Sequence, residues 1–197
     1  MPIFLHAVQH GHRIVNLFNF QYDGLDIFAP REAQMNLVSL ITSGLLDDFP
    51  GLNIIHAEMG TKTIKSLAQR LDANFNQPTL SYEDDEGATA GARRRLSPKA
   101  PQLVPPERAN EKNKLIPSHY FRKNFYWTIE TEEPELAEAI QFIGSDRFLF
   151  ATDFPHDDPG GRMKLKDVEL LAAHPKISDP DKEKIRSENA RSLFRLP

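Results

Sequence analysis

The chain has 197 residues, of which 40% are hydrophobic and 26% are charged, and its formal net charge is −4. This composition is ordinary for a globular domain and supplies enough apolar material for one sizeable core. The charge balance excludes a broad nucleic-acid-binding surface, because the only basic run is the short one at residues 93–95. The chain has no cysteine, so a bound metal would need His, Asp or Glu as its ligands.

The start of the chain lacks the features of a targeting segment. Residues 1–6 have no basic start followed by a long apolar stretch, and no apolar run approaches the roughly 20 residues that span a bilayer. We therefore expect a cytoplasmic protein with neither a membrane nor a nucleic acid as its partner.

Short apolar runs alternate with segments of helical period, which is typical of successive βα units. The predicted strands lie at residues 2–5, 52–55, 125–129 and 147–151. The predicted helices lie at residues 30–49, 61–75, 131–143, 164–173 and 178–194. The alternation predicts an α/β fold with a parallel sheet. A closed barrel of this kind needs eight units, so four units predict half of a barrel.

Several helix starts carry clear signals. Residues 61–75 place apolar side chains three and four positions apart, with Thr61 as the predicted N-cap. Residues 131–134, Thr-Glu-Glu-Pro, predict another start, because a cap, two acids and an early proline follow in order. Ser178 and Asp181 have the spacing of a capping box.

Residues 77–116 interrupt the alternation of predicted strands and helices. The segment is rich in proline and small residues, and it contains an acidic cluster and the arginine run. No hydrophobic period survives there, which indicates a loop-rich insertion. We predict one barrel domain over residues 1–197 that contains this insertion.

Candidate metal-binding and acid–base residues follow three of the predicted strands. His6 follows the first strand, His56 and Glu58 follow the second, and Asp153 follows the fourth. Catalytic residues of parallel barrels gather at the carboxyl ends of the strands. Alternation along a strand predicts that His56 and Glu58 face one pocket. Imidazole and carboxylate together suit Zn²⁺ or another divalent ion that keeps a position open for water or substrate.

Each of these residues also has a purely structural interpretation. His6 is equally consistent with a surface residue at a strand end. Glu58 is equally consistent with a cap on the helix that follows it, and Asp153 with a helix cap or a loop acid. The residue types alone leave these alternatives open.

Residues 144–156, GSDRFLFATDFPH, carry a more specific signal. They resemble the signature G-x-D-R-[IL]-L-F-[AG]-[ST]-D-[YF]-P-H of the amidohydrolase-related family, which includes aminocarboxymuconate-semialdehyde decarboxylase and the resorcylate-type decarboxylases. Three further segments are similar to conserved stretches of that family: FPGLNII at 49–55, PSHYFRKNFY at 117–126 and KIRSENARSLF at 184–194. The resemblance covers nearly the whole chain except residues 77–116.

The resemblance implies a distorted (β/α)₈ barrel with one divalent metal, of which this chain would form the C-terminal four units. Asp153 matches the family's metal-binding aspartate, and His6 matches its metal-binding histidine of the middle strand. The family's next strand ends in a catalytic histidine or glutamate. Glu58 occupies that position and His56 lies two residues earlier, so the resemblance leaves the choice between them open.

The activity implied is metal-dependent hydrolysis of a cyclic amide or ester, or nonoxidative decarboxylation of a small aromatic or enoic acid. We expect Zn²⁺ or Mn²⁺ as cofactor and a small molecule as substrate, with Tyr120, Trp127 and His156 lining the pocket. The alternative is a noncatalytic half-barrel, because the family's first-strand metal pair has no counterpart before His6. An unpaired strand edge in such a half-barrel favours a homo-oligomer.

Overall fold

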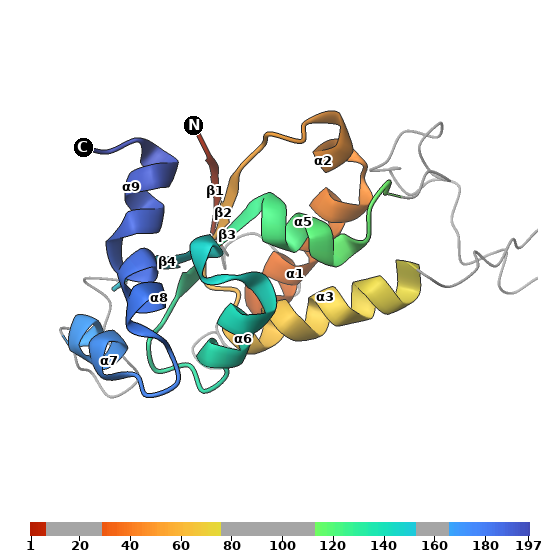
Figure 1. Cartoon of the computed structure of the whole chain (residues 1–197). Helices are drawn as coiled ribbons and strands as arrows, with labels where there is room; N and C mark the ends of the chain where they lie inside the picture. Colours follow the sequence, from red (N-terminus) through yellow and green to blue (C-terminus); the bar gives the residue numbers. More distant parts are fainter. Residues whose placement is uncertain (7–28, 76–112, 153–165) are drawn as a thin grey trace, which may run out of the picture.

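The computed structural model of the chain describes residues 1–6, 29–75, 113–152 and 166–197. Four strands form a parallel sheet in chain order: β1 (Ile3–Leu5), β2 (Ile54–His56), β3 (Phe125–Ile129) and β4 (Phe148–Phe150) (Figure 1). Each strand precedes a helical connection, which confirms the predicted α/β class with a parallel sheet. Because all four strands run in one direction, their carboxyl ends meet at one edge of the sheet.

The helices run between and after the strands. They are α1 (Ala29–Thr42), α2 (Leu45–Asp48), α3 (Thr61–Phe75), α5 (Pro117–Lys123), α6 (Leu136–Ile143), α7 (Asp167–Ala173), α8 (Asp179–Glu183) and α9 (Asn189–Phe194), with a π-helical turn (Lys184–Glu188) that joins α8 to α9. No helix in the described part of the chain is both long and apolar enough to cross a membrane.

Two helix boundaries differ from the sequence-based expectation. The first predicted helix is split, because Gly44 adopts a left-handed conformation (φ 77°) that ends α1 and starts α2. The helix expected from Thr131 begins only at Leu136. The Thr131 hydroxyl lies 3.4 Å from Asp167 Oδ1, so it links β3 to the start of α7 instead of capping α6.

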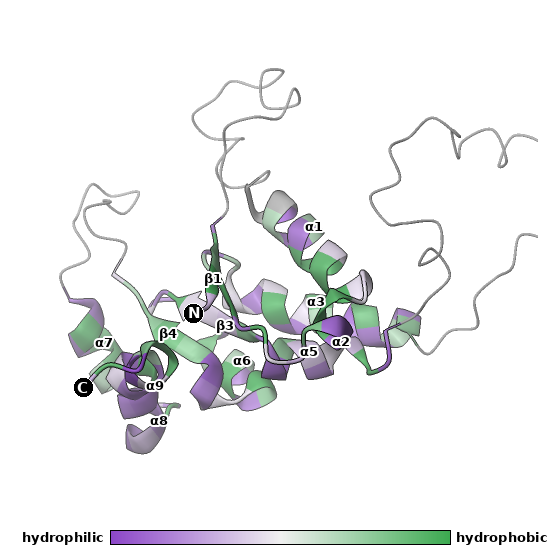
Figure 2. Ribbon diagram, turned by 90° about the horizontal axis from the view of Figure 1, so that it is seen from above, coloured by the Kyte–Doolittle hydropathy of each residue, from purple (hydrophilic) through white to green (hydrophobic). Residues whose placement is uncertain are grey.

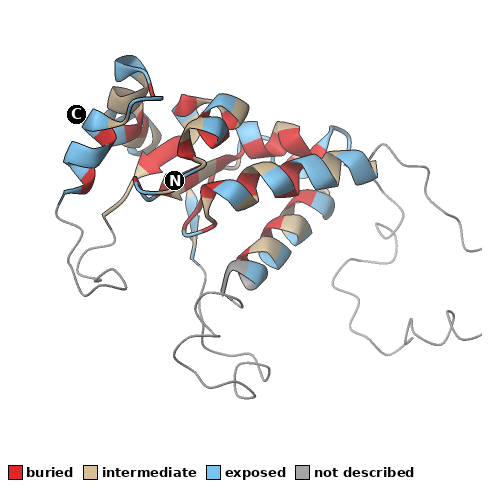
Figure 3. Cartoon of the chain, turned by 90° about the horizontal axis from the view of Figure 1, so that it is seen from below, coloured by how far each residue is buried: buried red, intermediate tan, exposed pale blue. Residues whose placement is uncertain are grey.

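The core lies between the sheet and its helices. Along β3 the buried positions alternate with half-buried ones, and Phe125, Trp127 and Ile129 face the helix layer. The residues that α3 buries lie on one side of the helix (Figure 3). Ile64 among them is fully buried, which is worth about 1.5–3 kcal/mol. The predicted apolar face of residues 61–75 is therefore confirmed.

In the described part of the chain, each outer strand of the sheet has one unpaired edge. Within the described residues, β1 pairs only with β2, and β4 pairs only with β3. Ile3 and Phe4 of β1 are 47% and 58% exposed, unlike the buried residues of β2. An open edge of this kind is expected to be covered by a further strand or another chain.

The final helical segment is tied to the sheet by one buried amide. The Asn189 side chain donates to Ser145 O (2.7 Å) and Phe148 O (2.8 Å), and the residue is 7% exposed. Ahead of it, α8 begins as the capping box predicts, because Ser178 Oγ accepts a hydrogen bond from the Asp181 amide. This helix is largely hydrophilic (Figure 2), so Asn189 and its apolar neighbour Ile185 supply the attachment.

We expect Asn189→Ala to lower the free energy of unfolding by about 2–3 kcal/mol, because it leaves two carbonyl groups without their donor. Urea unfolding followed by circular dichroism measures the change. The matched control is Ser192→Ala at an exposed position of α9, with an expected change within about 0.5 kcal/mol. Equal stability of the two variants would contradict the role assigned to Asn189.

Candidate active site

Two ionisable side chains meet at the carboxyl edge of the sheet. His6 directly follows β1, and Glu58 lies two residues beyond the end of β2. His6 Nε2 is 3.1 Å from Glu58 Oε1, and the two side chains are 45% and 39% exposed. The pair is therefore close enough for a direct hydrogen bond and open enough to meet a small molecule from solution.

His6 lies on the sheet face opposite the helices. Phe4 and His6 share that face by strand alternation, and their rings stack with centroids 6.4 Å apart. Leu5, between them, packs against the helix-side core. In a closed barrel the face opposite the helices is the interior, and active sites lie at its C-terminal end, where His6 follows β1.

Glu58 reaches His6 because the chain turns sharply after β2. The ladder between β1 and β2 ends with the Ala57 amide, which donates to Leu5 O. Glu58 then takes a left-handed conformation (φ 55°), which is uncommon for a residue with a side chain. Its backbone amide donates to Thr128 Oγ1 on β3 (3.3 Å). Thr128 thus holds this turn from the neighbouring strand.

His56 does not share this site. Its ring lies in the helix-side layer, stacked on Trp127 with centroids 5.9 Å apart and with Nε2 3.3 Å from Ala33 O of α1. The expectation that His56 and Glu58 face one pocket was therefore wrong. The left-handed conformation of Glu58 breaks the strand alternation on which that expectation rested.

The environment of His56 favours a neutral imidazole. The residue is 1% exposed, and burial lowers the pKa of its side chain. Hydrogen bonding to the carbonyl groups of Ala57 and Ala33 acts in the opposite direction, since the charged ring would donate to both. The loss of hydration is the larger effect.

The two described aromatic residues that were expected to line the pocket lie in the core. Trp127 is fully buried, and its Nε1 donates to Phe121 O (3.4 Å). Tyr120 is 2% exposed and donates to Asp47 Oδ1 (2.6 Å). Burial, together with that hydrogen bond, raises the pKa of Tyr120 to about 12. Both side chains stabilise the helix layer in the structure, so neither reaches the His6–Glu58 pair.

Asp153 and His156 lie outside the described residues, so their predicted roles stay predictions. The described residues contain no cluster of three or more His, Asp or Glu side chains arranged around one point. His6 and Glu58 supply two converging donors, an imidazole nitrogen and a carboxylate oxygen, and both are accessible. The imidazole suits a divalent cation, which would need further ligands to complete its shell.

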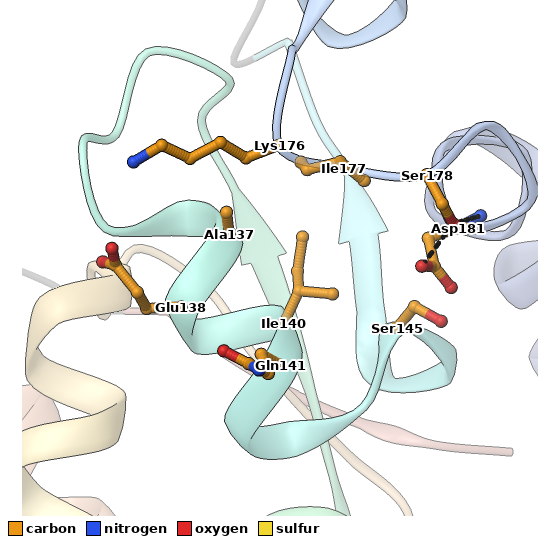
Figure 4. A pocket seen from close by; sticks show the side chains of 9 residues that line it. All are labelled: Ala137, Glu138, Ile140, Gln141, Ser145, Lys176, Ile177, Ser178 and Asp181. Carbon is orange, nitrogen blue, oxygen red and sulfur yellow. Dashed lines mark hydrogen bonds between the residues drawn. The ribbon is translucent and has the colours of Figure 1, made fainter.

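A separate pocket lies elsewhere on the molecule. It measures about 480 Å³ and lies between α6 and the chain that leads into α8, lined by Glu138, Gln141, Ser145, Lys176, Ser178 and Asp181 among others (Figure 4). Hydrogen bonds from Ser145 and Ser178 lower the pKa of Asp181. These contacts tie α8 to Ser145, at the start of the short turn before β4, and none of the predicted site residues that the structure describes lines this pocket.

A parallel sheet with an accessible imidazole–carboxylate pair at its carboxyl edge is an arrangement typical of barrel enzymes. The comparison with protein families specifies the class: the amidohydrolase family model matches residues 2–196, and the chain belongs to this family. The resemblance found in the sequence motifs is thereby confirmed.

The relatives found are named decarboxylases. The chain is 29% identical over 168 residues to a gamma-resorcylate decarboxylase of Polaromonas sp. JS666, and 28% identical to one of Rhizobium sp. MTP-10005. Each alignment covers 84% of this chain and 41% of the relative. The chain thus spans less than half the length of the curated relatives it matches.

Solved structures show the same similarity. A dihydroxybenzoic acid decarboxylase of Polaromonas sp. JS666, solved with manganese and 2-nitroresorcinol, matches with a TM-score of 0.65 and 27% identity, over 99% of this chain and 50% of that one. A 5-carboxyvanillate decarboxylase of Sphingomonas paucimobilis matches with a TM-score of 0.70 and 24% identity, over 100% and 50%. The second match supports the fold alone.

Sequence reasoning missed two residues that shape this site, Thr128 and Glu133. Thr128 lies on the half-buried side of β3, where strand alternation alone points it away from the helices. Glu133 was assigned to the start of its own helix, yet its Oε2 accepts a hydrogen bond from the Thr61 amide of α3 (2.5 Å). Thr61, predicted as the N-cap, is the first residue of α3 and receives its cap from this distant carboxylate.

The buried His56 predicts a stability change in acid. Its folded pKa is below the unfolded value of about 6.5, so the unfolded state binds the proton more readily, and stability present above pH 6.5 is lost as the pH falls. Between about pH 7.5 and 5.5, we expect wild type to lose more free energy of unfolding than His56→Asn, by up to about 1.4 kcal/mol per pH unit. The free energy of unfolding is measured by urea unfolding at each pH. An equal loss in wild type and His56→Asn would refute this role of His56.

Proposed function

We propose that this chain forms part of a metal-dependent nonoxidative decarboxylase, a carboxy-lyase that acts on a small aromatic acid. The observation that carries the proposal is the convergence of His6 and Glu58 at the carboxyl edge of the sheet. The sequence alone left hydrolysis and decarboxylation open. Relatives named gamma-resorcylate decarboxylase and dihydroxybenzoic acid decarboxylase favour decarboxylation.

The proposal covers only a part of a barrel. The matched shares, 41% of the curated relatives and 50% of the solved structures, are those expected of such a part. These shares do not support the assignment of the chain to the C-terminal four units. We therefore propose only that the chain forms a part of a barrel. A single domain with an insertion at 77–116, a homo-oligomer and a cytoplasmic address stay predictions from the sequence.

In the proposed site, His6 and Asp153 hold a divalent ion. When bound, the ion neutralises and orients the anionic oxygen atoms of the acid substrate. The neighbour solved with manganese makes Mn²⁺ the first ion to test, with Zn²⁺ as the comparison. The carboxylate of Glu58 lies beside His6, accessible from the same side, and supplies the acid–base group.

The reaction breaks the bond between a ring carbon and the carboxyl carbon, releases CO₂, and places one proton on the ring carbon. We assign that proton transfer to Glu58, because its side chain is accessible and close to the proposed metal ligand. His56 has no place in this step, since its ring contacts α1 and β3 on the opposite face of the sheet. A general acid of this kind contributes about 10²–10⁴-fold to the rate.

The function is tested by metal content and CO₂ release on the same samples. After dialysis against Mn²⁺, we expect about one bound equivalent in wild type by elemental analysis, and loss of the ion in His6→Ala and in Asp153→Ala. Glu58→Gln, which keeps the shape of the side chain, should retain the metal and lose about 10²–10⁴-fold in release of CO₂ from 2,6-dihydroxybenzoate.

Glu132→Gln is the matched control, because Glu132 is an exposed acid of the β3–α6 connection. It should retain both the metal and the activity of wild type. A wild-type chain that binds manganese and releases no CO₂ would contradict the decarboxylase assignment. Equal metal content in wild type and His6→Ala would contradict the proposed ligand.

A further inference from the structure

The turn that carries Glu58 is strained and is held by residues from a different βα unit. Glu58 (φ 55°) and Gly60 (φ 74°) are both left-handed within three residues. The left-handed conformation costs about 1–2 kcal/mol for a residue with a side chain, so Glu58 does not favour it by itself. Some outside interaction must therefore stabilise the segment from Glu58 to Thr61.

The first outside interaction comes from β3. The Glu58 amide donates to Thr128 Oγ1 at 3.3 Å, which fixes the backbone of the residue whose carboxylate meets His6. Thr128 belongs to the strand that pairs with β2, so the hydroxyl is presented from a rigid element.

The second interaction comes from the connection between β3 and α6. Glu133 Oε2 accepts a hydrogen bond from the Thr61 amide at 2.5 Å, at the other end of the same turn. Glu133 is itself fixed, because its Oε1 accepts a hydrogen bond from the Glu130 amide (3.2 Å) and its own amide donates to Glu130 O (3.3 Å). A carboxylate at the N-terminus of a 15-residue helix is also favoured by the helix dipole.

We propose that Thr128 and Glu133 are positioning residues that hold the Glu58–Thr61 turn in its left-handed conformation and so direct the Glu58 side chain to His6. Thr128 and Glu133 accept hydrogen bonds from the first and last amides of the turn, and they lie 70 and 72 positions from those amides in the sequence. Neither of these two hydrogen bonds involves His6. The inference rests on the proposed function only for the catalytic role of Glu58.

The test uses the ring signals of His6 in ¹H–¹³C correlation spectra of the metal-free chain. All spectra are recorded at one pH and one temperature, so that only the substitution differs between samples. The signal of His6 among the seven histidines is assigned with His6→Asn. Wild type defines the signal position with the Glu58 contact, and Glu58→Ala defines the position without it.

We expect Thr128→Val and Glu133→Gln to move the His6 signals to the Glu58→Ala position, and Thr128→Ser, which keeps the hydroxyl, to restore the wild-type position. Glutamine at this position has one acceptor atom in place of two and no charge, so the Thr61 and Glu130 amides compete for that atom and the contact with Thr61 weakens. Thr131→Val and Glu132→Gln are the matched controls, because they make the same changes in the connection that follows β3, at residues for which the structure describes no contact with the turn, and they should leave the signals at the wild-type position.

Wild-type signal positions in Thr128→Val and Glu133→Gln would overturn the inference, and so would identical positions in wild type and Glu58→Ala. In the manganese-loaded chain, the same two variants should lower kcat by about tenfold or more with KM unchanged. If the ring signals respond as expected and wild type shows no CO₂ release, the decarboxylase proposal fails and the positioning inference stands.

Discussion

The in-register parallel pairing of β1, β2 and β3 is the constraint on which the candidate site depends. Leu5, His56 and Trp127 lie at one level across the three strands. The residues just beyond that level, His6 and Glu58, are therefore brought to one edge although 52 positions separate them in the sequence. A shift of β1 by one residue would turn His6 toward the helix layer and Leu5 to the opposite face.

The second constraint is the turn after β2, where strand alternation ends. Up to His56 the side chains alternate, and the imidazole of His56 is buried against α1. Two residues later Glu58 is left-handed, and its side chain lies on the open side of the sheet. The same sequence segment thus supplies a packing residue and an accessible acid. Backbone strain at a residue that meets another ionisable group is typical of functional sites.

Much of the fold was predictable because its signals are local. β3, α3 and the Ser178 capping box follow from alternation, helical spacing and cap chemistry within a few residues. The errors concern long-range partners. Tyr120 is a core residue because Asp47, 73 positions away, accepts its hydroxyl hydrogen bond. No local pattern encodes that contact, and an aromatic residue near a motif looks the same whether it lines a pocket or a core.

The site itself was predictable in its residue types and less so in its geometry. His6 and Glu58 were identified as candidates, because ionisable residues followed apolar strands. The separation of Glu58 from His56 was not, since a left-handed glutamate has no signature in composition or spacing. The contact of the Glu133 carboxylate with the start of α3 was also not predictable, because an acid near a helix start is normally assigned to the N-terminus of its own helix.

The most direct test of the account is a crystal structure of the chain grown with Mn²⁺, with the ion located by its anomalous scattering. The account predicts a manganese peak within bonding distance of a ring nitrogen of His6, on the sheet face that also carries Phe4. A manganese peak away from His6, with the His6–Glu58 contact unchanged, would contradict the assignment of this pair as the catalytic centre.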